Sequence, residues 1–491
     1  MIRSILESPL YPIINPRSIA FFGASNNFMR MGSLMLSSVQ ALGYEGKIFP
    51  IHLTEKEVRG HQAYASIMDV PEVPDLAIIV LPTEIVCRTL ADCGKKGIRH
   101  AIVVSGGFRE AGPEGVALQR ELEAVADRFG IRFLGPNCLG IANPHLKLNP
   151  TTITAEGPPG FVGLASQSGS FVTQMFDYLH LHGMGFSAAV SVGNEANIDI
   201  VNCLEYLGAC PHTKVITLYV EGITRGRAFI ETAQAITPHK PIVALYIGGS
   251  EAGRHAGLSH TGSLSGPDEI YDGMFKQCGI IRARTLAELF DYALALGTLP
   301  RPKGNRVIIQ THSGGPGATA ADACGRAGLT LPRLSAETVE KLKPMIPRTA
   351  STANPLDLTY SLNSAQNFFD IPDILLEDEK ADILLAYFLS PGMFMERIMR
   401  EMGVPEETIP AERDKMIDQH ADQFVSLKER HPDKAIIGFT YRSLQEKMVR
   451  RVLDQGIPVY QDPERAARSL AAVLQYYEMR DKIVQGEPAS D

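Results

Sequence analysis

Short apolar runs alternate with longer helix-like segments along the whole of this 491-residue chain. This alternation is typical of α/β proteins, in which helices cover the faces of parallel sheets. We predict strands in three groups. The first group is Ser18–Phe22, Lys47–Ile51, Asp75–Val80, Ala101–Val104 and Ile131–Leu134. The second is Phe161–Ala165, Ala188–Val192, Lys214–Val220, Pro241–Leu245 and Gly279–Arg282, and the third is Arg306–Gln310, Asp382–Tyr387, Ala435–Phe439 and Ile457–Tyr460.

A strand, a Gly/Ser turn and a helix follow one another in each group. The three turns are Gly23-Ala24-Ser25-Asn26-Asn27, Ser166-Gln167-Ser168-Gly169-Ser170 and His312-Ser313-Gly314-Gly315. Such a turn directs free N–H groups and the positive end of a helix dipole at whatever lies above the sheet. One turn is weak evidence because Gly-rich turns are common, but three in one chain indicate a protein that handles phosphate groups.

A histidine, His260, lies among glycines and serines after the predicted strand Pro241–Leu245. Small neighbours leave an imidazole unshielded and let a ligand approach the backbone. Such a residue acts as a nucleophile, a general base or a metal ligand, or is only a surface or capping residue. Local chemistry leaves these alternatives open.

Composition excludes several classes of partner. The net charge of −8 argues against nucleic acid or an anionic membrane as the main partner, and no apolar run approaches the ~20 residues of a membrane span. The N-terminal residues show no signal-peptide pattern. Seven scattered cysteines without CxxC spacing indicate free thiols in a reducing cytoplasm and no protein-bound metal.

The length suggests three domains at about 150 residues each. Proline-rich stretches at 144–150 and 299–304 divide the chain into residues 1–146, 147–299 and 300–491. A charged, helix-like stretch around Met395–Glu429 is predicted to be an addition to the third domain.

The order of motifs resembles the alpha subunit of ADP-forming acyl-CoA synthetases, which are relatives of succinyl-CoA synthetase. The most specific motif is Ser259-His260-Thr261-Gly262-Ser263-Leu264-Ser265-Gly266, which is similar to the family's phosphohistidine loop. The others are Gly135-Pro136-Asn137-Cys138-Leu139-Gly140, Ser166-Gln167-Ser168-Gly169-Ser170, Val192-Gly193-Asn194, Tyr219-Val220-Glu221-Gly222 and Asn354-Pro355-Leu356-Asp357-Leu358.

This resemblance implies a Rossmann-like CoA-binding domain followed by two flavodoxin-like ligase domains. It also implies that His260 carries a phosphoryl group between an acyl phosphate and a nucleoside diphosphate, with Glu221 as the partner of its imidazole. Phosphate would bind at Ser168, Gly169, Ser170, Ser313, Gly314 and Gly315, and coenzyme A at Gly23, Ala24, Ser25, Asn26, Pro82 and Asn137.

No stretch reads as the ATP-grasp domain of fused relatives. The resemblance therefore implies a separate ATP-grasp beta subunit in a hetero-oligomer, with Mg²⁺ and ADP or ATP bound there. The acyl group is not identified by any motif.

Two departures leave a second hypothesis open, in which the chain is a non-catalytic sensor of CoA or acyl-CoA. Tyr246 and Gly249 stand where relatives often carry basic residues. A third hypothesis, an NAD-dependent dehydrogenase, is disfavoured because the first turn is not a GxGxxG sequence.

Three further residues invite a functional interpretation. Cys138 follows a strand, but the family's chemistry needs no second thiolate. His255 lacks the Thr-Gly that follows His260 and is interpreted as a loop residue. His312 is either a phosphate contact or an exposed surface residue.

Overall fold

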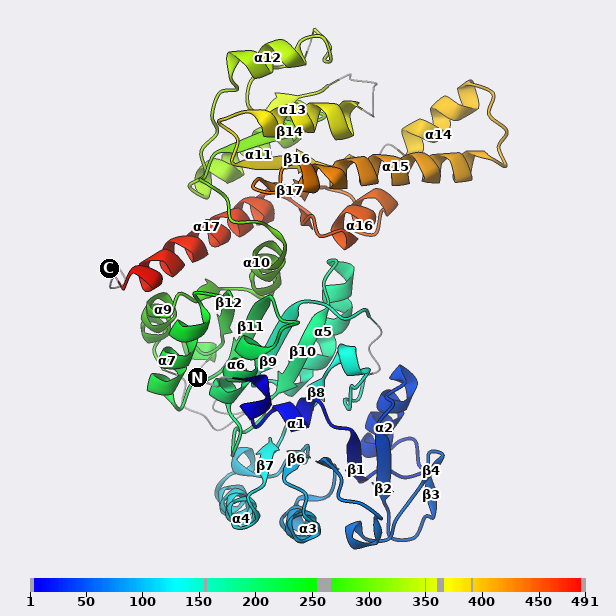
Figure 1. Ribbon diagram of the computed structural model, residues 1–491, viewed down its shortest axis with the longest axis vertical. Coiled ribbons are helices and arrows are strands. Elements are labelled where there is room, and N and C mark those ends of the chain that lie inside the picture. The colour runs from blue at the N-terminus through cyan, green and yellow to red at the C-terminus, as the bar shows by residue number, and fades with distance from the viewer. Residues whose placement is uncertain are drawn as a thin grey trace. The chain divides into compact units, whose positions relative to one another are not determined.

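The chain forms two compact units, of which the first comprises residues 1–180, 184–289 and 479–491, and the second residues 181–183 and 290–478. A computed structural model describes residues 4–153, 157–253, 266–348, 350–359, 366–389 and 392–486. These residues form three main sheets with mostly parallel strands (Figure 1), which confirms the predicted α/β class. Within the described ranges, no helix combines the length and hydropathy of a membrane span.

The first sheet has the order β2-β1-β5-β6-β7 and lies in the first unit. Its strands are β1 (Ser18–Phe22), β2 (Lys47–Ile51), β5 (Leu76–Ile79), β6 (His100–Val103) and β7 (Arg132–Leu134). Helices α3 (Thr83–Lys96) and α4 (Pro113–Phe129) pack side by side, while α2 (Met31–Leu42) follows β1. Smaller elements here are η1 (Ile5–Glu7), α1 (Tyr11–Ile14), β3 (Glu57–Val58), β4 (His61–Gln62), η2 (Ile67–Asp69) and η3 (Arg109–Ala111).

Strand β1 is buried on both faces, as expected for a central parallel strand. Ala20 and Phe22 join the core formed with α3 and α4. Ile19 and Phe21 instead join a core that continues into the second sheet and includes Leu218. This shared core explains why the first two sheets form one compact unit.

The second sheet has the order β13-β12-β11-β9-β10-β8 and also lies in the first unit. Its strands are β8 (Ile141–Ala142), β9 (Val162–Ser166), β10 (Phe186–Ser191), β11 (Val215–Val220), β12 (Ile242–Tyr246) and β13 (Ile281–Ala283). Its helices include α5 (Gly169–Leu181), α6 (Ile200–Ala209), α7 (Gly226–Ile236) and α9 (Asp268–Gln277). Strand β8 pairs antiparallel with β10 and precedes η4 (Pro144–Leu146), so the chain enters this sheet just before the expected boundary at residue 146.

The third sheet has the order β15-β14-β16-β17-β18 and lies in the second unit. Its strands are β14 (Val307–Thr311), β15 (Leu356–Asp357), β16 (Ile383–Tyr387), β17 (Ala435–Phe439) and β18 (Val459–Tyr460). The other elements are α10 (Leu286–Thr298), α11 (Gly314–Arg326), α12 (Ala336–Leu342), η5 (Gln366–Asp370), α13 (Ile371–Glu377), α14 (Gly392–Glu401), α15 (Ile409–Arg430), α16 (Lys447–Asp454) and α17 (Pro463–Gln485). Helices α14 and α15 form the predicted charged addition and extend away from this sheet (Figure 1).

All three sheets share one strand order. When the parallel strands of each sheet are counted along the chain, the order is 2-1-3-4-5, with β8 added beside β10. Ligands bind to sheets of this kind outside the carboxyl ends of the strands, where the first and third strands meet and the connections diverge. Each of the three predicted Gly/Ser turns directly follows the first strand of its sheet.

Candidate active site

The turn after β1 is closed so tightly that only glycine fits. Gly23 has a φ of 93°, and a Cβ atom there would lie 1.9 Å from the carbonyl oxygen of Val80. Gly32, in the first turn of α2, packs equally closely on the carbonyl of Gly23. The backbone N–H of Ser25 donates to Ser33 Oγ at 3.0 Å. The start of α2 is thus held directly against the turn, as a phosphate-binding turn requires.

The side-chain amide of Asn26 forms hydrogen bonds with other residues of the chain. Its Nδ2 donates to Glu55 Oε2 at 2.7 Å and to the carbonyl of Glu57 at 2.8 Å, while its Oδ1 accepts from the N–H of Arg59 at 3.0 Å. The side chain therefore fixes the β3–β4 hairpin beside the turn, and sequence reasoning had no signal for this role.

The other expected CoA contacts lie along the same carboxyl edge of the first sheet. Pro82 is exposed at the start of α3, after β5. Leu81 and Ser105 exchange hydrogen bonds, the Ser105 Oγ donating to the Leu81 carbonyl at 2.5 Å. The N–H of Asn137 donates to the Ser105 carbonyl at 2.9 Å. The ends of β5, β6 and β7 are joined in this way.

Asn137 also connects this edge to the second sheet. Its Nδ2 donates to Asn194 Oδ1 at 3.4 Å, and Asn194 Nδ2 donates to Glu110 Oε2 at 2.5 Å and to Gln119 Oε1 at 3.2 Å. The Asn194 N–H donates to the Pro136 carbonyl at 2.9 Å. The motifs around residues 137 and 194, far apart in sequence, are therefore in direct contact within the first unit.

The second Gly/Ser turn begins α5 against this junction. Ser166 Oγ, at the end of β9, donates to the Ser168 carbonyl at 2.7 Å and accepts from the Ser168 N–H at 3.1 Å. A Cβ atom on Gly169 would lie 3.3 Å from the backbone nitrogen of Leu139. Ser170 is exposed, and its Oγ lies 3.5 Å from Ser168 Oγ. The turn thus brings two hydroxyls and the first N–H groups of α5 together.

Gln167 holds Glu221 beside the same turn. Its Oε1 accepts from the N–H groups of Glu221 at 2.5 Å and Gly222 at 3.0 Å, and its Nε2 donates to the Gly222 carbonyl at 2.6 Å. Both side chains are buried, with 9% of Gln167 and 7% of Glu221 exposed. Glu221 therefore has a fixed position at the junction of β9 and β11. Gln167 belongs to the motif of residues 166–170, but its hydrogen bonds to Glu221 and Gly222 depend on the pairing of β9 with β11.

Glu195 is a second carboxyl group beside Gln167, and it is partly buried. Burial raises its pKa to about 7, although hydrogen bonds from Gln167 and from the Ile200 N–H oppose the rise. Its φ of 54° is unusual for a residue with a side chain. None of the motifs used above pointed to this residue.

The third turn, in the second unit, repeats the geometry of the second. Thr311 Oγ1, at the end of β14, donates to the Ser313 carbonyl at 2.9 Å, as Ser166 does to Ser168. Gly314 and Gly315 are exposed at the start of α11. His312 is partly buried, and burial lowers its pKa to about 4, so the exposed-surface alternative is wrong and its imidazole is neutral at pH 7.

His260 and His255 lie outside the described residues, which resume at Gly266 after Gly253. Cys138 is buried, its thiol donates to the Val103 carbonyl at 3.5 Å, and burial raises its pKa to about 12. Burial and a raised pKa argue against a thiolate nucleophile at Cys138. All seven cysteines are buried free thiols.

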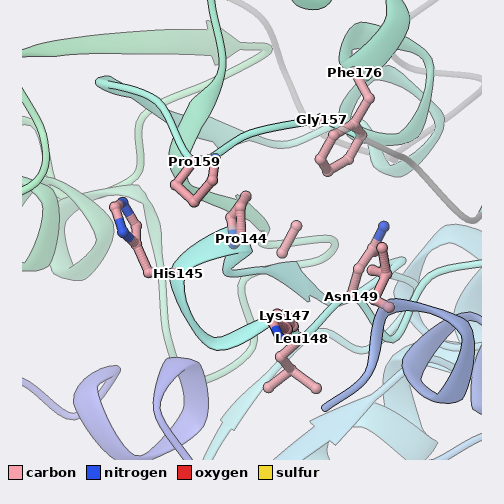
Figure 2. Close-up of a pocket in the computed structure, with 10 residues that line it drawn as sticks. Pro144, His145, Lys147, Leu148, Asn149, Gly157, Pro159 and Phe176 are labelled. Carbon is pink, nitrogen blue, oxygen red and sulfur yellow. The ribbon is translucent and has the colours of Figure 1, made fainter.

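A pocket of about 330 Å³ lies elsewhere in the first unit, bordered by Pro144, Lys147, Asn149, Pro159 and Phe176 (Figure 2). None of the predicted site residues lines it. Across the described part of the chain, no three His, Cys, Asp or Glu side chains are grouped as metal ligands.

The fold is that of an α/β protein whose Gly/Ser turns lie at the switch points of its sheets. The sequence pattern of a CoA-binding domain matches residues 17–144, and that of a succinyl-CoA ligase-like flavodoxin domain matches residues 159–296. These matches confirm the predicted types of the first two domains.

Relatives that match nearly the whole chain identify its family more closely. The chain is 37% identical to the alpha subunit of acetate–CoA ligase [ADP-forming] II from Pyrococcus furiosus, over 94% of this chain and 96% of the relative. It is 35% identical to acetate–CoA ligase [ADP-forming] I from Archaeoglobus fulgidus, over 95% of this chain and 64% of the relative.

A solved structure also resembles this chain along most of its length. It is the dinucleotide-forming acetyl-coenzyme A synthetase 1 of Ca. Korarchaeum cryptofilum in complex with phosphate and ADP, which is 31% identical with a TM-score of 0.84 over 97% of this chain and 98% of that chain. The chain therefore belongs to the ADP-forming acyl-CoA synthetases, a family of acid–thiol ligases, and matches their alpha subunits along its length.

Proposed function

We propose that this chain is the alpha subunit of an NDP-forming acyl-CoA synthetase, which interconverts acyl-CoA, phosphate and ADP with a free acid, CoA and ATP. Family membership supports the reaction class. The observation that carries the proposal for this chain is the continuous arrangement from the CoA-type turn at Gly23, through Asn137 and Asn194, to Gln167 and Glu221 in one compact unit.

Three balanced steps make up the proposed reaction. A phosphate oxygen attacks the acyl carbonyl carbon, the C–S bond breaks, and CoA leaves as a thiolate, which takes up the proton that the hydrogen phosphate loses. A nitrogen of His260 then attacks phosphorus, the bond to the acyl oxygen breaks, and the acid leaves as a carboxylate. Finally, the phosphoryl group passes from His260 to a nucleoside diphosphate, and the imidazole is restored.

Glu221 is proposed to hold the second imidazole nitrogen as N–H while the first attacks. A carboxylate in this role stabilises the charge that develops on the ring. The bonds from the Glu221 and Gly222 N–H groups to Gln167 support this role, because they fix the backbone that carries the carboxylate.

The N–H groups at the start of α5, together with Ser168 and Ser170, are proposed to bind the phosphate. Backbone donors suit a transition state whose charge spreads over three equatorial oxygens. Ser313, Gly314 and Gly315 at the start of α11, in the second unit, are proposed to bind phosphate as well, a view supported by the matching hydrogen bonds of the two turns.

Coenzyme A, as a substrate, is proposed to lie along the carboxyl edge of the first sheet. Its phosphates would meet the turn at Gly23, Ala24 and Ser25, with Pro82 and Asn137 further along the edge. The closeness of α2 to this turn supports anion binding there. Asn26 would support the turn rather than contact the ligand through its amide.

The nucleotide is proposed to bind to a separate ATP-grasp beta subunit together with Mg²⁺. Two Pyrococcus relatives, matched along 96% and 99% of their lengths, are named as alpha subunits, which supports the existence of a partner subunit. The buried free thiols support a reducing, cytoplasmic environment. We also propose the domain limits 1–146, 147–299 and 300–491.

The test is a release assay with the purified full chain. Acyl-CoAs of different chain length are mixed with phosphate, and free CoA thiol and protein-bound phosphate are measured together. We expect one acyl-CoA to release thiol only when phosphate is present, with no ATP formed from ADP until a beta subunit is added. CoA binding without phosphate-dependent release for any acyl-CoA, even with the beta subunit, would favour a sensor and contradict the proposal.

A further inference from the structure

Glu195 lies where the second sheet meets the carboxyl edge of the first. Its neighbours in sequence are bound to that edge, because the Asn194 N–H donates to the Pro136 carbonyl at 2.9 Å and the Ala196 N–H to the Gly135 carbonyl at 3.2 Å. With a φ of 54°, Glu195 itself has a left-handed backbone conformation that costs energy for a residue with a side chain. Such strain is kept where the surrounding structure and function require it.

The carboxylate of Glu195 completes the hydrogen bonding of Gln167. It accepts from the Ile200 N–H at 2.8 Å, at the start of α6, and from the side chain of Gln167. The amide of a glutamine has two N–H groups and an oxygen with two lone pairs. In Gln167 the oxygen accepts from the N–H groups of Glu221 and Gly222, and one N–H donates to the Gly222 carbonyl. The bond to Glu195 uses the remaining N–H, so every polar site of this amide has a partner.

This set of bonds decides which way the Gln167 amide faces. If the amide turned over, its NH₂ group would face two backbone N–H donors, and its oxygen would face the Gly222 carbonyl and the Glu195 carboxylate. The charge of Glu195 strengthens the observed orientation, because a hydrogen bond to an ionised acceptor is roughly twice as strong as one between neutral groups. Protonation of Glu195 therefore weakens the hold on Gln167.

The charge state of Glu195 changes near neutral pH. Burial raises its pKa to about 7, while hydrogen bonds from Gln167 and the Ile200 N–H oppose the rise. Among the described residues, the other charged or titratable groups that interact with it electrostatically are Asp199 and Cys203 of α6 and its N-cap, Arg109 of η3, Arg225 before α7 and Tyr271 of α9. The raised pKa means that ionisation of Glu195 costs the fold stability, which is lost as pH rises through 7.

We propose that Glu195 is a positioning residue whose carboxylate fixes the Gln167 amide and, through it, the backbone that carries Glu221. This inference rests on the proposed function, in which Glu221 acts during phosphoryl transfer. The ionised form costs stability but holds Gln167 better, so rate and stability depend on pH in opposite directions. A merely structural role would change the two in the same direction. Positioning affects rate more than binding, because a small misplacement of a catalytic group slows the reaction.

The test uses Glu195→Gln, which keeps the shape of the side chain and stays neutral at every pH. The readouts, taken on both sides of pH 7, are the single-turnover rate of protein phosphorylation from acyl-CoA and phosphate, the melting temperature and the CoA-induced thermal shift. The wild-type rate is divided by that of the variant, because this ratio cancels the titration of phosphate and of other groups that both proteins share.

We expect the rate ratio to be close to one well below pH 7, where Glu195 is protonated, and to rise to about fivefold above it, with a midpoint near 7. Over the same range the melting temperature of the wild type should fall relative to that of Glu195→Gln. The CoA-induced thermal shift should be the same in both proteins.

Two further variants separate positioning from other effects. Asp75→Asn is the matched control, because Asp75 is a partly buried carboxylate of the same unit that accepts from the Arg17 N–H at 2.9 Å, just before β5. Its rate should equal that of the wild type at every pH. When Glu195→Gln is added to Gln167→Ala, the double variant should be no slower than Gln167→Ala alone, because Glu195 acts through Gln167.

A Glu195→Gln variant with the wild-type rate above pH 7 would overturn the proposal, and so would equal slowing in Asp75→Asn. Losses that multiply in the double variant would also overturn it, since Glu195 would then act on the reaction without Gln167. These outcomes leave phosphorylation of the wild type intact. If the wild-type chain itself takes up no phosphate from any acyl-CoA, even with the beta subunit present, the proposed function fails and this inference fails with it.

Discussion

Gln167 offers the sharpest test of how Glu221 is held, because one side chain makes three hydrogen bonds at the junction of β9 and β11. Gln167→Ala removes all three, together with the hydrogen bond from Gln167 to Glu195. At a net contribution of about 1 kcal/mol for each of these four bonds, the first unit should lose about 4 kcal/mol of stability. Two backbone N–H groups would also be left without their partner, which adds to the loss.

Gln167→Glu separates the hydrogen bonds that Gln167 accepts from the one that it donates. A carboxylate oxygen still accepts from the Glu221 and Gly222 N–H groups, but the oxygen that replaces Nε2 faces the Gly222 carbonyl and cannot donate to it. It also adds a negative charge beside Glu195. We expect a stability loss between that of Gln167→Ala and that of the wild type.

The assay is the urea midpoint of the first unit, combined with the rate of protein phosphorylation. Gln40→Ala is the control, because Gln40 donates a single bond, to the Arg59 carbonyl at 2.7 Å, and should cost about 1 kcal/mol. Phosphorylation should slow at least about tenfold in Gln167→Ala and stay unchanged in Gln40→Ala. A Gln167→Ala variant as stable and as fast as the wild type would refute the role given to Gln167.

Three further predictions follow from single residues. Gly23→Ala should abolish the CoA-induced thermal shift, because its Cβ would clash with the Val80 carbonyl at a φ of 93°; a normal shift would contradict the turn's role. The raised pKa of Glu195, about 7, implies that folding is favoured below the unfolded value near 4.5 and that this stability is lost as pH rises through 7. Glu195→Gln should therefore flatten the stability curve between pH 4.5 and 7, and an unchanged curve would contradict this. Cys138→Ala should keep its phosphorylation rate, since its thiol has a pKa of about 12; loss of phosphorylation in a folded variant would count against this.

Each strand predicted from an apolar run bounded by turns has a counterpart in the structure. β1 and β2 match the predicted limits, and β17 does too. β8 and β15 were missed because a strand of two residues is too short to show an alternation of apolar and polar side chains. Each is defined by its backbone pairing, β8 with β10 and β15 with β14. Their pairing is decided by tertiary packing.

Some residues of the candidate site could likewise be recognised from local sequence, and others depend on distant contacts. The turns at Gly23 and Gly169 could be recognised locally from their Gly/Ser sequences between a strand and a helix, and at Gly23 the close approach of the Val80 carbonyl requires the glycine. The roles of Asn194 and Gln167 could not, since each depends on a contact across more than 50 residues of sequence. Tyr246 stands where relatives often carry a basic residue. Its ring stacks on that of Tyr271, with 3.6 Å between the ring centroids, and no motif predicts this contact.

The most direct test of the central claim is the location of the phosphoryl group. The full chain is incubated with acyl-CoA and phosphate, and its intact mass, acid-lability and modified peptide are determined for the wild type and for His260→Ala. The account predicts one acid-labile, alkali-stable phosphoryl group on His260 that is absent from the variant. Phosphate on another residue, or equal labelling of His260→Ala, would contradict it.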